Sequence, residues 1–171
     1  MTQPANALPA AESAVFDLPD EAATAALAGR LAAQAQRGDV YALFGDLGAG
    51  KTSFARAFIN ALPGGPEEVP SPTFTLVQTY RRGDLEIWHV DLYRLGGPEE
   101  SLELGLEDGY AEATMLIEWP ERLGALLPET RLDLALAYAA EGGRRATITP
   151  RGTWRAERPD WLRTFAEDGK A

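Results

Sequence analysis

Eight consecutive residues, GDLGAGKT, combine glycine, lysine and threonine at a spacing suited to binding an anion. The pattern G-x-x-x-x-G-K-[ST] of phosphate-binding loops is matched by Gly45, Gly50, Lys51 and Thr52. Glycines allow the backbone angles at which successive N–H groups converge on one anion, and a helix that begins there adds its dipole. In this pattern the lysine reaches the outer phosphates of a nucleotide and the threonine hydroxyl binds Mg²⁺. The stretch therefore predicts a nucleotide-phosphate site.

The residues around this stretch favour that interpretation over a glycine-rich turn with an incidental lysine. DVYALFG, before the loop, is typical of a short buried strand, and TSFARAFINAL, after it, is typical of a helix with one apolar face. A strand, a glycine loop and a helix in series are the context that the motif requires. Asp46 is an unusual member of the loop because a carboxylate would repel a phosphate. We expect its side chain to turn outward or to accept loop N–H groups.

Two carboxylates are candidates for the chemistry next to the phosphates. Glu118 ends the apolar run TMLIE, and Asp91 lies in IWHVDLY. A nucleotide-hydrolysing site needs a carboxylate at the end of a buried strand to position Mg²⁺ or water. Acids at strand ends also cap neighbouring turns, so a structural role is the alternative for either one. Which of the two contacts Mg²⁺ stays open.

Other polar residues have a functional and a structural interpretation. In VPSPTFTLV two prolines stiffen an extended segment, and Thr73 is either a switch residue that senses the γ-phosphate or part of an ordinary polar turn. Arg94 is either a stabiliser of developing charge or one half of a surface ion pair. His89, the only histidine, is either a proton relay or a hydrogen-bonded core residue.

The remaining pattern predicts an α/β fold. EAATAALAGRLAAQAQRG indicates an early helix. FTLVQTY and LEIWHVDLY indicate two strands around a tight turn, TMLIE a buried strand, and RLDLALAYA with RRATITP a final hairpin. Strands that alternate with helices early and pair as neighbours later predict an α/β sheet with an antiparallel flank.

Length and composition limit the function classes. The 171 residues, 45% of them hydrophobic, suffice for one domain, which we place at 15–150, between a flexible extension (1–14) and a tail (151–171) with a short helix from Pro159. We expect the tail aromatics Trp154, Trp161 and Phe165 to pack on the core. No cysteine is present, which excludes disulfides, thiolate metal sites and cysteine nucleophiles. No signal or membrane-spanning run is found, so we expect a cytoplasmic protein.

The charge argues against a direct grip on nucleic acid. Asp and Glu number 26 against 16 Lys and Arg, which gives a net charge of −10. Sequence-independent binding to nucleic acid depends on cations that neutralise phosphates. If RNA is involved, we expect a partner protein to hold it, and the nucleotide phosphates must be held by local fields.

Five motifs together resemble one protein family. GDLGAGKT, SPTFTLV, HVDLYRL, LGLED and LIEWPE follow one another in the order and spacing of the TsaE (YjeE) family, and the resemblance runs from about Leu18 to Thr149. It implies a P-loop NTPase-like three-layer sandwich whose mainly parallel central sheet carries an antiparallel flanking hairpin. It also implies an accessory ATPase, with ATP and Mg²⁺, for N6-threonylcarbamoyladenosine modification of tRNA next to the anticodon. The implied partner is the TsaB–TsaD complex, which handles the tRNA; neither DNA nor a membrane is implied.

The resemblance also implies roles for individual residues. Thr52 and Glu118 would bind Mg²⁺, Asp91 would act as an acid-base or water-orienting group, and Thr73 would be the switch threonine. Trp119 would lie near the nucleotide, with plain core packing as the alternative. Asp20 and Arg144 would flank the adenine, with Arg145 as the alternative to Arg144. The residues implied to bind the ATP phosphates are Asp46, Leu47, Gly48, Ala49, Gly50, Lys51 and Thr52.

These features lead to a mechanism and to rival functions. We expect slow hydrolysis by the chain alone, stimulation by partners, and partner association that depends on the bound nucleotide. A small-molecule kinase is one alternative, although no arginine-rich lid segment is seen between Trp119 and Pro150. A nucleotide-gated binding module that needs no hydrolysis is another. A GTPase is disfavoured because D-x-x-G and N-K-x-D are both absent.

Overall fold

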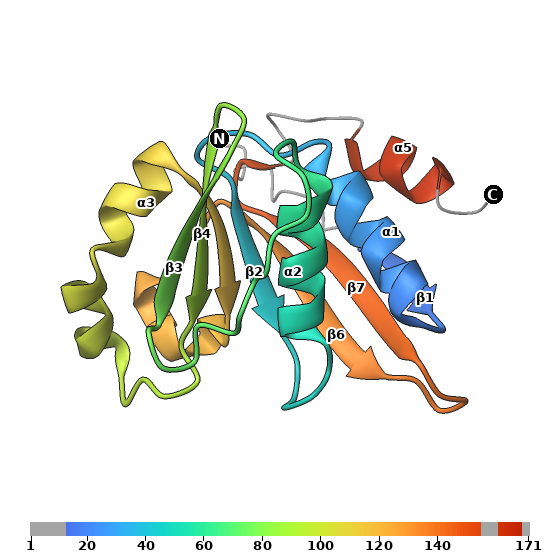
Figure 1. The fold of residues 1–171 in the computed structure, drawn as a ribbon. Helices are drawn as coiled ribbons and strands as arrows, with labels where there is room; N and C mark the ends of the chain where they lie inside the picture. Colours follow the sequence, from blue (N-terminus) through green and yellow to red (C-terminus); the bar gives the residue numbers. More distant parts are fainter. Residues whose placement is uncertain (1–12, 155–160, 169–171) are drawn as a thin grey trace, which may run out of the picture.

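The computed structural model of the chain describes residues 13–154 and 161–168. The strands are β1 (Ala14–Leu18), β2 (Val40–Phe44), β3 (Val77–Arg82), β4 (Leu85–Asp91), β5 (Thr114–Glu118), β6 (Arg131–Tyr138) and β7 (Arg144–Arg151) (Figure 1). The helices are α1 (Glu21–Ala32), α2 (Lys51–Ala61), η1 (Pro98–Leu104), α3 (Leu106–Glu112), η2 (Pro120–Leu126) and α5 (Trp161–Asp168), where η marks a 3₁₀ helix.

Within the described residues, seven strands form one mixed sheet in the order β1-β7-β6-β2-β5-β4-β3. The central strands β6, β2, β5 and β4 run parallel to one another. β3 is added antiparallel at one edge, and β7 and β1 are added antiparallel at the other. The predicted parallel centre with an antiparallel flanking hairpin is confirmed. Because β2 and β5 are parallel neighbours, the loop after β2 and the residue that ends β5 meet at one edge of the sheet.

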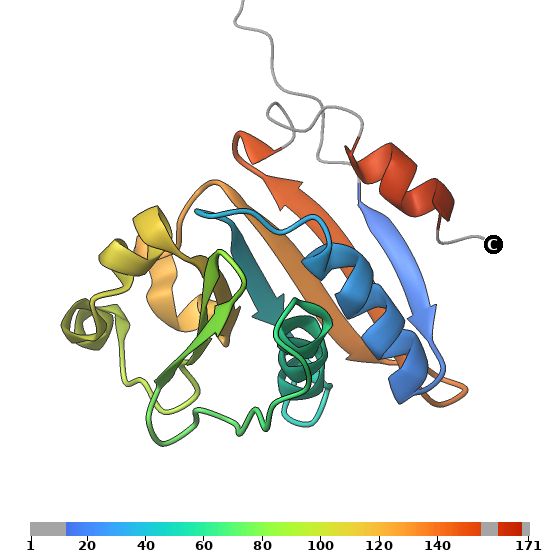
Figure 2. The ribbon, with the colours of Figure 1, turned by 45° about the horizontal axis from the view of Figure 1, so that its top comes forward.

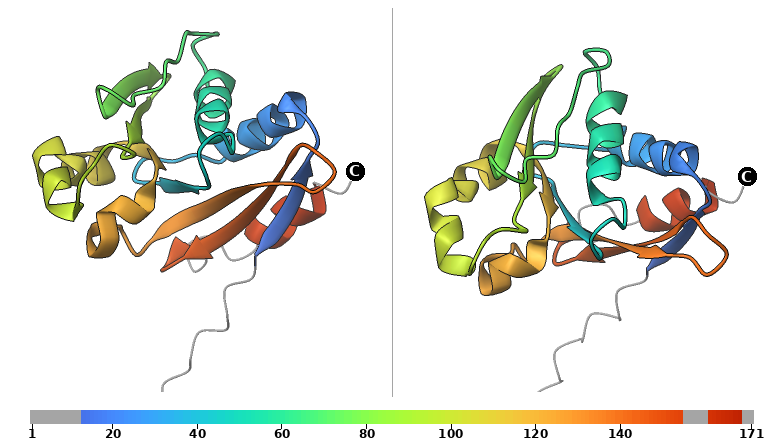
Figure 3. Two further views of the ribbon diagram at one scale, coloured as in Figure 1. Left: turned by 90° about the horizontal axis from the view of Figure 1, so that it is seen from below. Right: turned by 60° about the horizontal axis from the view of Figure 1, so that its bottom comes forward.

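Helices cover both faces of the sheet. α1 and α2 lie side by side on one face, and η1, α3 and η2 lie on the other (Figures 2 and 3). The second helical layer covers β2, β5 and β4, where Val40, Val90 and Met115 pack with Leu106 and Leu123. On the same face β7 carries polar residues instead, because the alternate positions Ala146 and Ile148 belong to the core below α1 and α2. The part of the sheet from β2 to β4 therefore lies between two helical layers, whereas the part formed by β6 and β7 is covered by helices on one face.

The core fixes the position of the glycine loop. β2 is apolar throughout because both of its faces are covered: Tyr41 packs toward α2 and Val40 toward the opposite layer. In α2, Phe54 and Phe58 lie one turn apart and are fully buried, and the Phe58 ring centroid is 4.9 Å from that of Tyr41. The strand and the helix on either side of the loop are therefore held by the same core.

β1 forms one edge of the sheet, and α5 packs beside it. β1 begins at Ala14, so the sheet starts one residue inside the N-terminal extension that we expected, whose residues 1–12 lie outside the described part. In the tail, Trp154 is buried, and the Phe165 ring of α5 contacts Phe16 and the Arg30 guanidinium. The Trp161 side chain and the start of a helix at Pro159 lie outside what the structure describes. No described helix has the length and apolarity that a membrane crossing requires.

Candidate functional site

The glycine loop joins the carboxyl end of β2 to the first residue of α2. Gly45 has φ +145°, and a Cβ there would lie 2.5 Å from the carbonyl oxygen of Leu136, so the rigid backbone of β6 excludes any side chain. Gly50 is the N-cap of α2, and Lys51 is the first residue of the helix. The free N–H groups of the first helical turn and the positive end of the helix dipole therefore face the loop. The Asp46 side chain is exposed.

Lys51 reaches back over the loop. Its Nζ donates to the carbonyl oxygens of Gly45, at 2.5 Å, and Asp46, at 2.9 Å, and lies 4.0 Å from the centroid of the Trp119 ring. Burial lowers the pKa of the Lys51 ammonium, and the nearby carboxylates of Glu118, Glu121 and Asp91 oppose this effect. The side chain is thus a buried cation above a turn of backbone amides, which suits an anionic ligand.

Glu118 lies opposite Thr52 across the edge of the sheet. Both carboxylate oxygens of Glu118 are 3.0 Å from the Thr52 hydroxyl, and the Glu118 side chain is buried. The parallel register that pairs Glu118 with Leu43 of β2 brings it beside the start of α2. Hydroxyl and carboxylate oxygens are the ligands that Mg²⁺ takes in phosphate sites. The donor set therefore fits the predicted metal.

His89 also contacts this carboxylate. Its Nε2 is 2.7 Å from Oε1 of Glu118, and the imidazole is fully buried, with no hydrogen-bond partner at Nδ1 among the residues that the structure describes. An ionised carboxylate only accepts hydrogen bonds, so the contact requires the proton on Nε2. His89 is therefore a buried, hydrogen-bonded residue, and the Glu118 carboxylate that it bonds is a candidate ligand for the metal.

Asp91 ends β4 next to Glu118 of β5 in the parallel register. Its Oδ2 accepts the Thr73 hydroxyl at 2.9 Å and the Ser71 hydroxyl at 3.5 Å, and its Oδ1 accepts the Tyr93 N–H at 3.0 Å. Asp91 is thus tied to the segment predicted as a switch, whereas Glu118 is tied to the helix after the glycine loop. The two carboxylates have different partners and can have different roles.

The segment after Pro72 is a turn, so the predicted strand beginning at Phe74 is wrong for its first three residues. β3 begins only at Val77, and the Leu76 N–H donates to the Pro72 carbonyl at 2.6 Å. Leu76 has φ +65°, a left-handed conformation that a strand does not contain. The Phe74 side chain is 84% exposed, and the Arg94 guanidinium lies 4.9 Å from its ring centroid. Within the described residues, Arg94 makes this contact instead of an ion pair.

Two adjoining cavities meet at the glycine loop. One, of about 340 Å³, lies between Lys51, Thr73, Asp91, Glu118 and Trp119. The other, of about 750 Å³, lies between the α1 start, the α2 face and the β6–β7 hairpin. Gly48, Gly50 and Ser53 line both. The pair has the form expected for a ligand with a phosphate end and a larger organic end.

Asp20 and Arg144 both line the larger cavity, and each also has a structural contact. Asp20 is the N-cap of α1, where its Oδ1 accepts the Ala23 N–H at 2.8 Å. Arg144 faces the glycine loop and donates to its carbonyls. Arg145 points to the opposite face of the sheet and pairs with Asp17 at 2.9 Å, so the hairpin register favours Arg144 for this side.

Among the described residues, no group of three or more His, Asp or Glu side chains could hold a metal by itself. Mg²⁺ in nucleotide sites is usually held by one or two protein groups together with substrate phosphates. His89 was predicted as either a proton relay or a core residue, whereas Tyr93 and Tyr138, which also lie at the site, were not predicted. The Tyr93 ring contacts Trp119 and the Tyr138 hydroxyl bonds to Leu47, and both contacts join segments far apart in the chain that no local spacing reveals.

A mixed sheet with a parallel centre, a glycine loop between β2 and α2, and a threonine that faces a strand-end carboxylate define a P-loop-like α/β protein. The family model described as "Threonylcarbamoyl adenosine biosynthesis protein TsaE" matches residues 18–146. The chain belongs to the TsaE family, as the resemblance of its motifs implied.

Individual relatives agree with this assignment. The chain is 41% identical over 131 residues to the tRNA threonylcarbamoyladenosine biosynthesis protein TsaE of Rickettsia felis, which covers 77% of each protein. It is 40% identical over 130 residues to the protein of the same name from Bacillus subtilis, covering 75% of this chain and 80% of that protein. The crystal structure of Bacillus subtilis YdiB superposes with a TM-score of 0.74 at 29% identity, covering 94% of this chain and 96% of that one.

Proposed function

We propose that this chain is a Mg²⁺-dependent ATPase that serves tRNA threonylcarbamoyladenosine biosynthesis by nucleotide-dependent association with the TsaB–TsaD complex. The family and the names of the relatives support the pathway. The observation that carries the activity is the hydrogen bonding of Thr52 to both oxygens of Glu118, beside the buried Lys51 and the helix N-terminus. These groups provide a cation, amides and metal-binding oxygens around one small cavity.

Each group then has a role in hydrolysis. Lys51 leaves the Gly45 and Asp46 carbonyls to pair with the outer phosphates of ATP, and the amides at the start of α2 bind the same phosphates. Thr52 and Glu118 would hold Mg²⁺, which would supply positive charge beside the phosphates. Asp91 orients a water whose oxygen bonds to the γ-phosphorus as the bond to the bridging oxygen breaks. The water proton leaves by way of Asp91 or with the released phosphate.

The same geometry supports a switch. Thr73 and Ser71 are held by Asp91 in this structure, so recruitment of Asp91 to water or of Thr73 to the metal would release the turn at Pro72–Leu76. Phe74, at the tip of that turn, is largely exposed and would move with it. The nucleotide state would thereby alter a surface that a partner protein can contact.

The test is Mg²⁺-dependent ATP hydrolysis by the purified chain, alone and with TsaB, TsaD and tRNA, with Lys51→Ala as the blank. We expect slow turnover alone, faster turnover with the partners, and none in the variant. Turnover that ignores the partners and rises with a small-molecule acceptor would instead indicate a kinase. If Asp91→Ala binds ATP, loses hydrolysis and still supports modification of tRNA, the chain is a binding module that needs no hydrolysis.

A further inference from the structure

The β6–β7 hairpin contacts the glycine loop at three consecutive carbonyl groups. The Tyr138 hydroxyl donates to the carbonyl oxygen of Leu47 at 3.2 Å. Arg144 donates from Nη2 to the carbonyl oxygen of Gly48 and from Nε to that of Ala49, both at 3.1 Å. The Arg144 guanidinium also lies over the Tyr138 ring, 4.1 Å from its centroid.

These contacts determine which way the loop amides point. A peptide unit is planar and trans, so its C=O and N–H groups point in opposite directions. A hairpin that holds the carbonyls of Leu47 and Ala49 on its own side therefore turns the amides of Gly48 and Gly50 away from it. The Ala49 amide is already used by the Asp46 carbonyl at 3.0 Å.

We propose that Arg144 and Tyr138 are positioning residues that preorganise the amides of the phosphate-binding loop, and this inference rests on the proposed ATP-binding function. The remaining Arg144 nitrogen, Nη1, donates to the Gly143 carbonyl at 2.9 Å, so every guanidinium nitrogen has a backbone acceptor. The residue acts on the loop through its fork of donors. Lysine has a single nitrogen, so it cannot bond the Gly48, Ala49 and Gly143 carbonyls from three separate atoms as the guanidinium does.

The hairpin also lies close to the backbone of Gly48 in the loop. Gly48 has φ +78°, and a Cβ there would lie 2.8 Å from the Tyr138 hydroxyl oxygen. The hairpin therefore contacts backbone that has no side chain in between. Arg145, one residue along, points to the other face and provides a matched control.

The experiment measures binding of ATP, tripolyphosphate and adenosine to Tyr138→Phe, Arg144→Lys and the control Arg145→Lys by calorimetry or competition. We expect Tyr138→Phe to weaken ATP and tripolyphosphate by about threefold to tenfold, since it deletes one hydrogen bond. Arg144→Lys should weaken both by about tenfold or more although its charge remains. Adenosine binding should not change, and Arg145→Lys should match the unmodified chain.

Three outcomes would overturn the proposal. One is normal tripolyphosphate binding by both Tyr138→Phe and Arg144→Lys. Another is normal binding by Arg144→Lys with a loss only in Arg144→Met, because then charge and not the donor fork would matter. The third is a loss confined to adenosine, which would make Arg144 a contact of the base. Melting temperatures identify a variant that fails to fold. Tyr138→Phe deletes one exposed hydroxyl contact, so we expect it to fold and to test the proposal even if the Arg144 variant does not fold.

Failure of the proposed function is distinguishable. If the unmodified chain binds neither ATP nor tripolyphosphate, that function is wrong. The positioning role is then tested by hydrogen exchange of the loop amides in the free protein. Gly48 and Gly50 amides that exchange equally fast in the unmodified chain and in Arg144→Lys would contradict it, whereas faster exchange in the variant would support it.

Discussion

Glu118 is the residue on which the site depends most. It is buried, it accepts from Thr52 and from His89, and its charge acts on Lys51. A buried carboxylate is costly unless hydrogen bonds satisfy it. Each of these neighbours therefore stabilises the carboxylate as well as orienting it toward the loop.

His89 gives the first prediction. His89→Leu removes a hydrogen bond to a buried charged group, so the free energy of unfolding should fall by about 1 to 3 kcal/mol. His89→Gln retains an N–H donor, so its free energy of unfolding should fall by less. Urea denaturation at neutral pH measures both. If His89→Leu is as stable as the unmodified chain, the hydrogen bond between His89 and Glu118 does not stabilise the fold.

Tyr110 gives a pH prediction. Burial raises the pKa of the Tyr110 hydroxyl to about 12 from its usual value of 10.0, with Glu107 adding to the effect. Between these values the unfolded chain loses this proton and the folded chain keeps it, so stability falls as pH rises through that window. In Tyr110→Phe this contribution is absent, and the denaturation midpoint should decline less over the same range. An identical decline in both proteins would contradict the prediction.

At the level of elements, the β2–loop–α2 unit is predictable because everything that defines it is local. Strand, glycines and amphipathic helix follow one another within about twenty residues. The helices η1, α3 and η2 were not predicted, because each has only seven residues, too few to show a helical period. Their burial depends on the far face of the sheet, which is formed by residues distant in the chain.

The residues of the site likewise divide into those that a local motif identifies and those whose contacts depend on distant parts of the chain. Thr52 and Lys51 are identified by a local motif, and Glu118 and Asp91 by their positions at strand ends. Residues 74–76, in the turn that follows Pro72, were mistaken for strand because FTLV has β-forming residues, and the hydrogen bond of Thr73 to Asp91 overrides that propensity. The His89–Glu118 contact depends on the parallel pairing of β4 with β5, which no spacing in the sequence reveals.

The start of α1 gives a prediction at this level. Asp20 caps the helix through the Ala23 N–H, so Asp20→Ala should lower the free energy of unfolding by about 1 kcal/mol, whereas Asp20→Asn retains an acceptor and should lose less. Denaturant titration measures this. ATP affinity tests whether Asp20 also contacts the ligand. If Asp20→Asn binds ATP as weakly as Asp20→Ala, the carboxylate contacts the ligand directly in addition to capping the helix.

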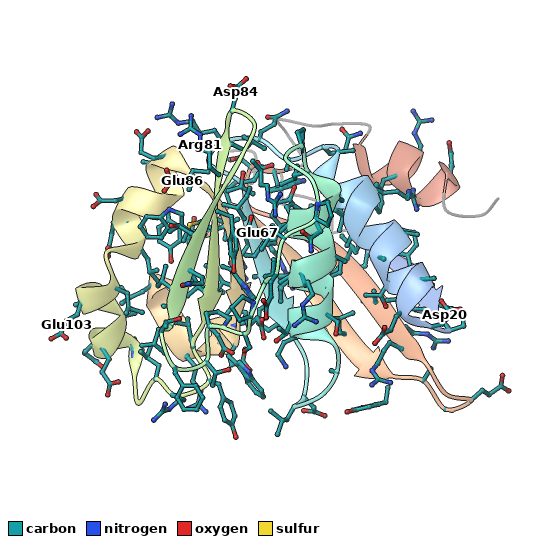
Figure 4. All side chains as sticks on the ribbon, in the orientation of Figure 1. Asp20, Glu67, Arg81, Asp84, Glu86 and Glu103 are labelled. Carbon is teal, nitrogen blue, oxygen red and sulfur yellow. The ribbon has the colours of Figure 1, made fainter. Side chains whose placement is uncertain are left out.

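For the whole molecule, charge is the dominant property. Acidic side chains labelled in Figure 4 are spread over distant elements, from Asp20 at α1 to Asp84 at the β3–β4 turn and Glu103 on η1. With a net charge of −10, the molecule as a whole repels polyanions.

We therefore predict that the chain alone does not bind tRNA at physiological salt. Fluorescence anisotropy of labelled tRNA should stay flat as the protein is added, and should rise only when the partner proteins are present. Binding by the chain alone that weakens steeply with salt would contradict this, because it would require a cationic surface.

The sheet joins two segments that lie far apart in the sequence, since Ala14 of β1 pairs with Ile148 of β7. A protein is made from its N-terminus, so β1 emerges from the ribosome long before its partner strand exists. The wall of the larger cavity that contains Leu18 and Arg144 cannot be assembled until β7 has been synthesised. A nascent chain can thus form its glycine loop well before it completes the ligand cavity, because about eighty further residues must be synthesised before Arg144.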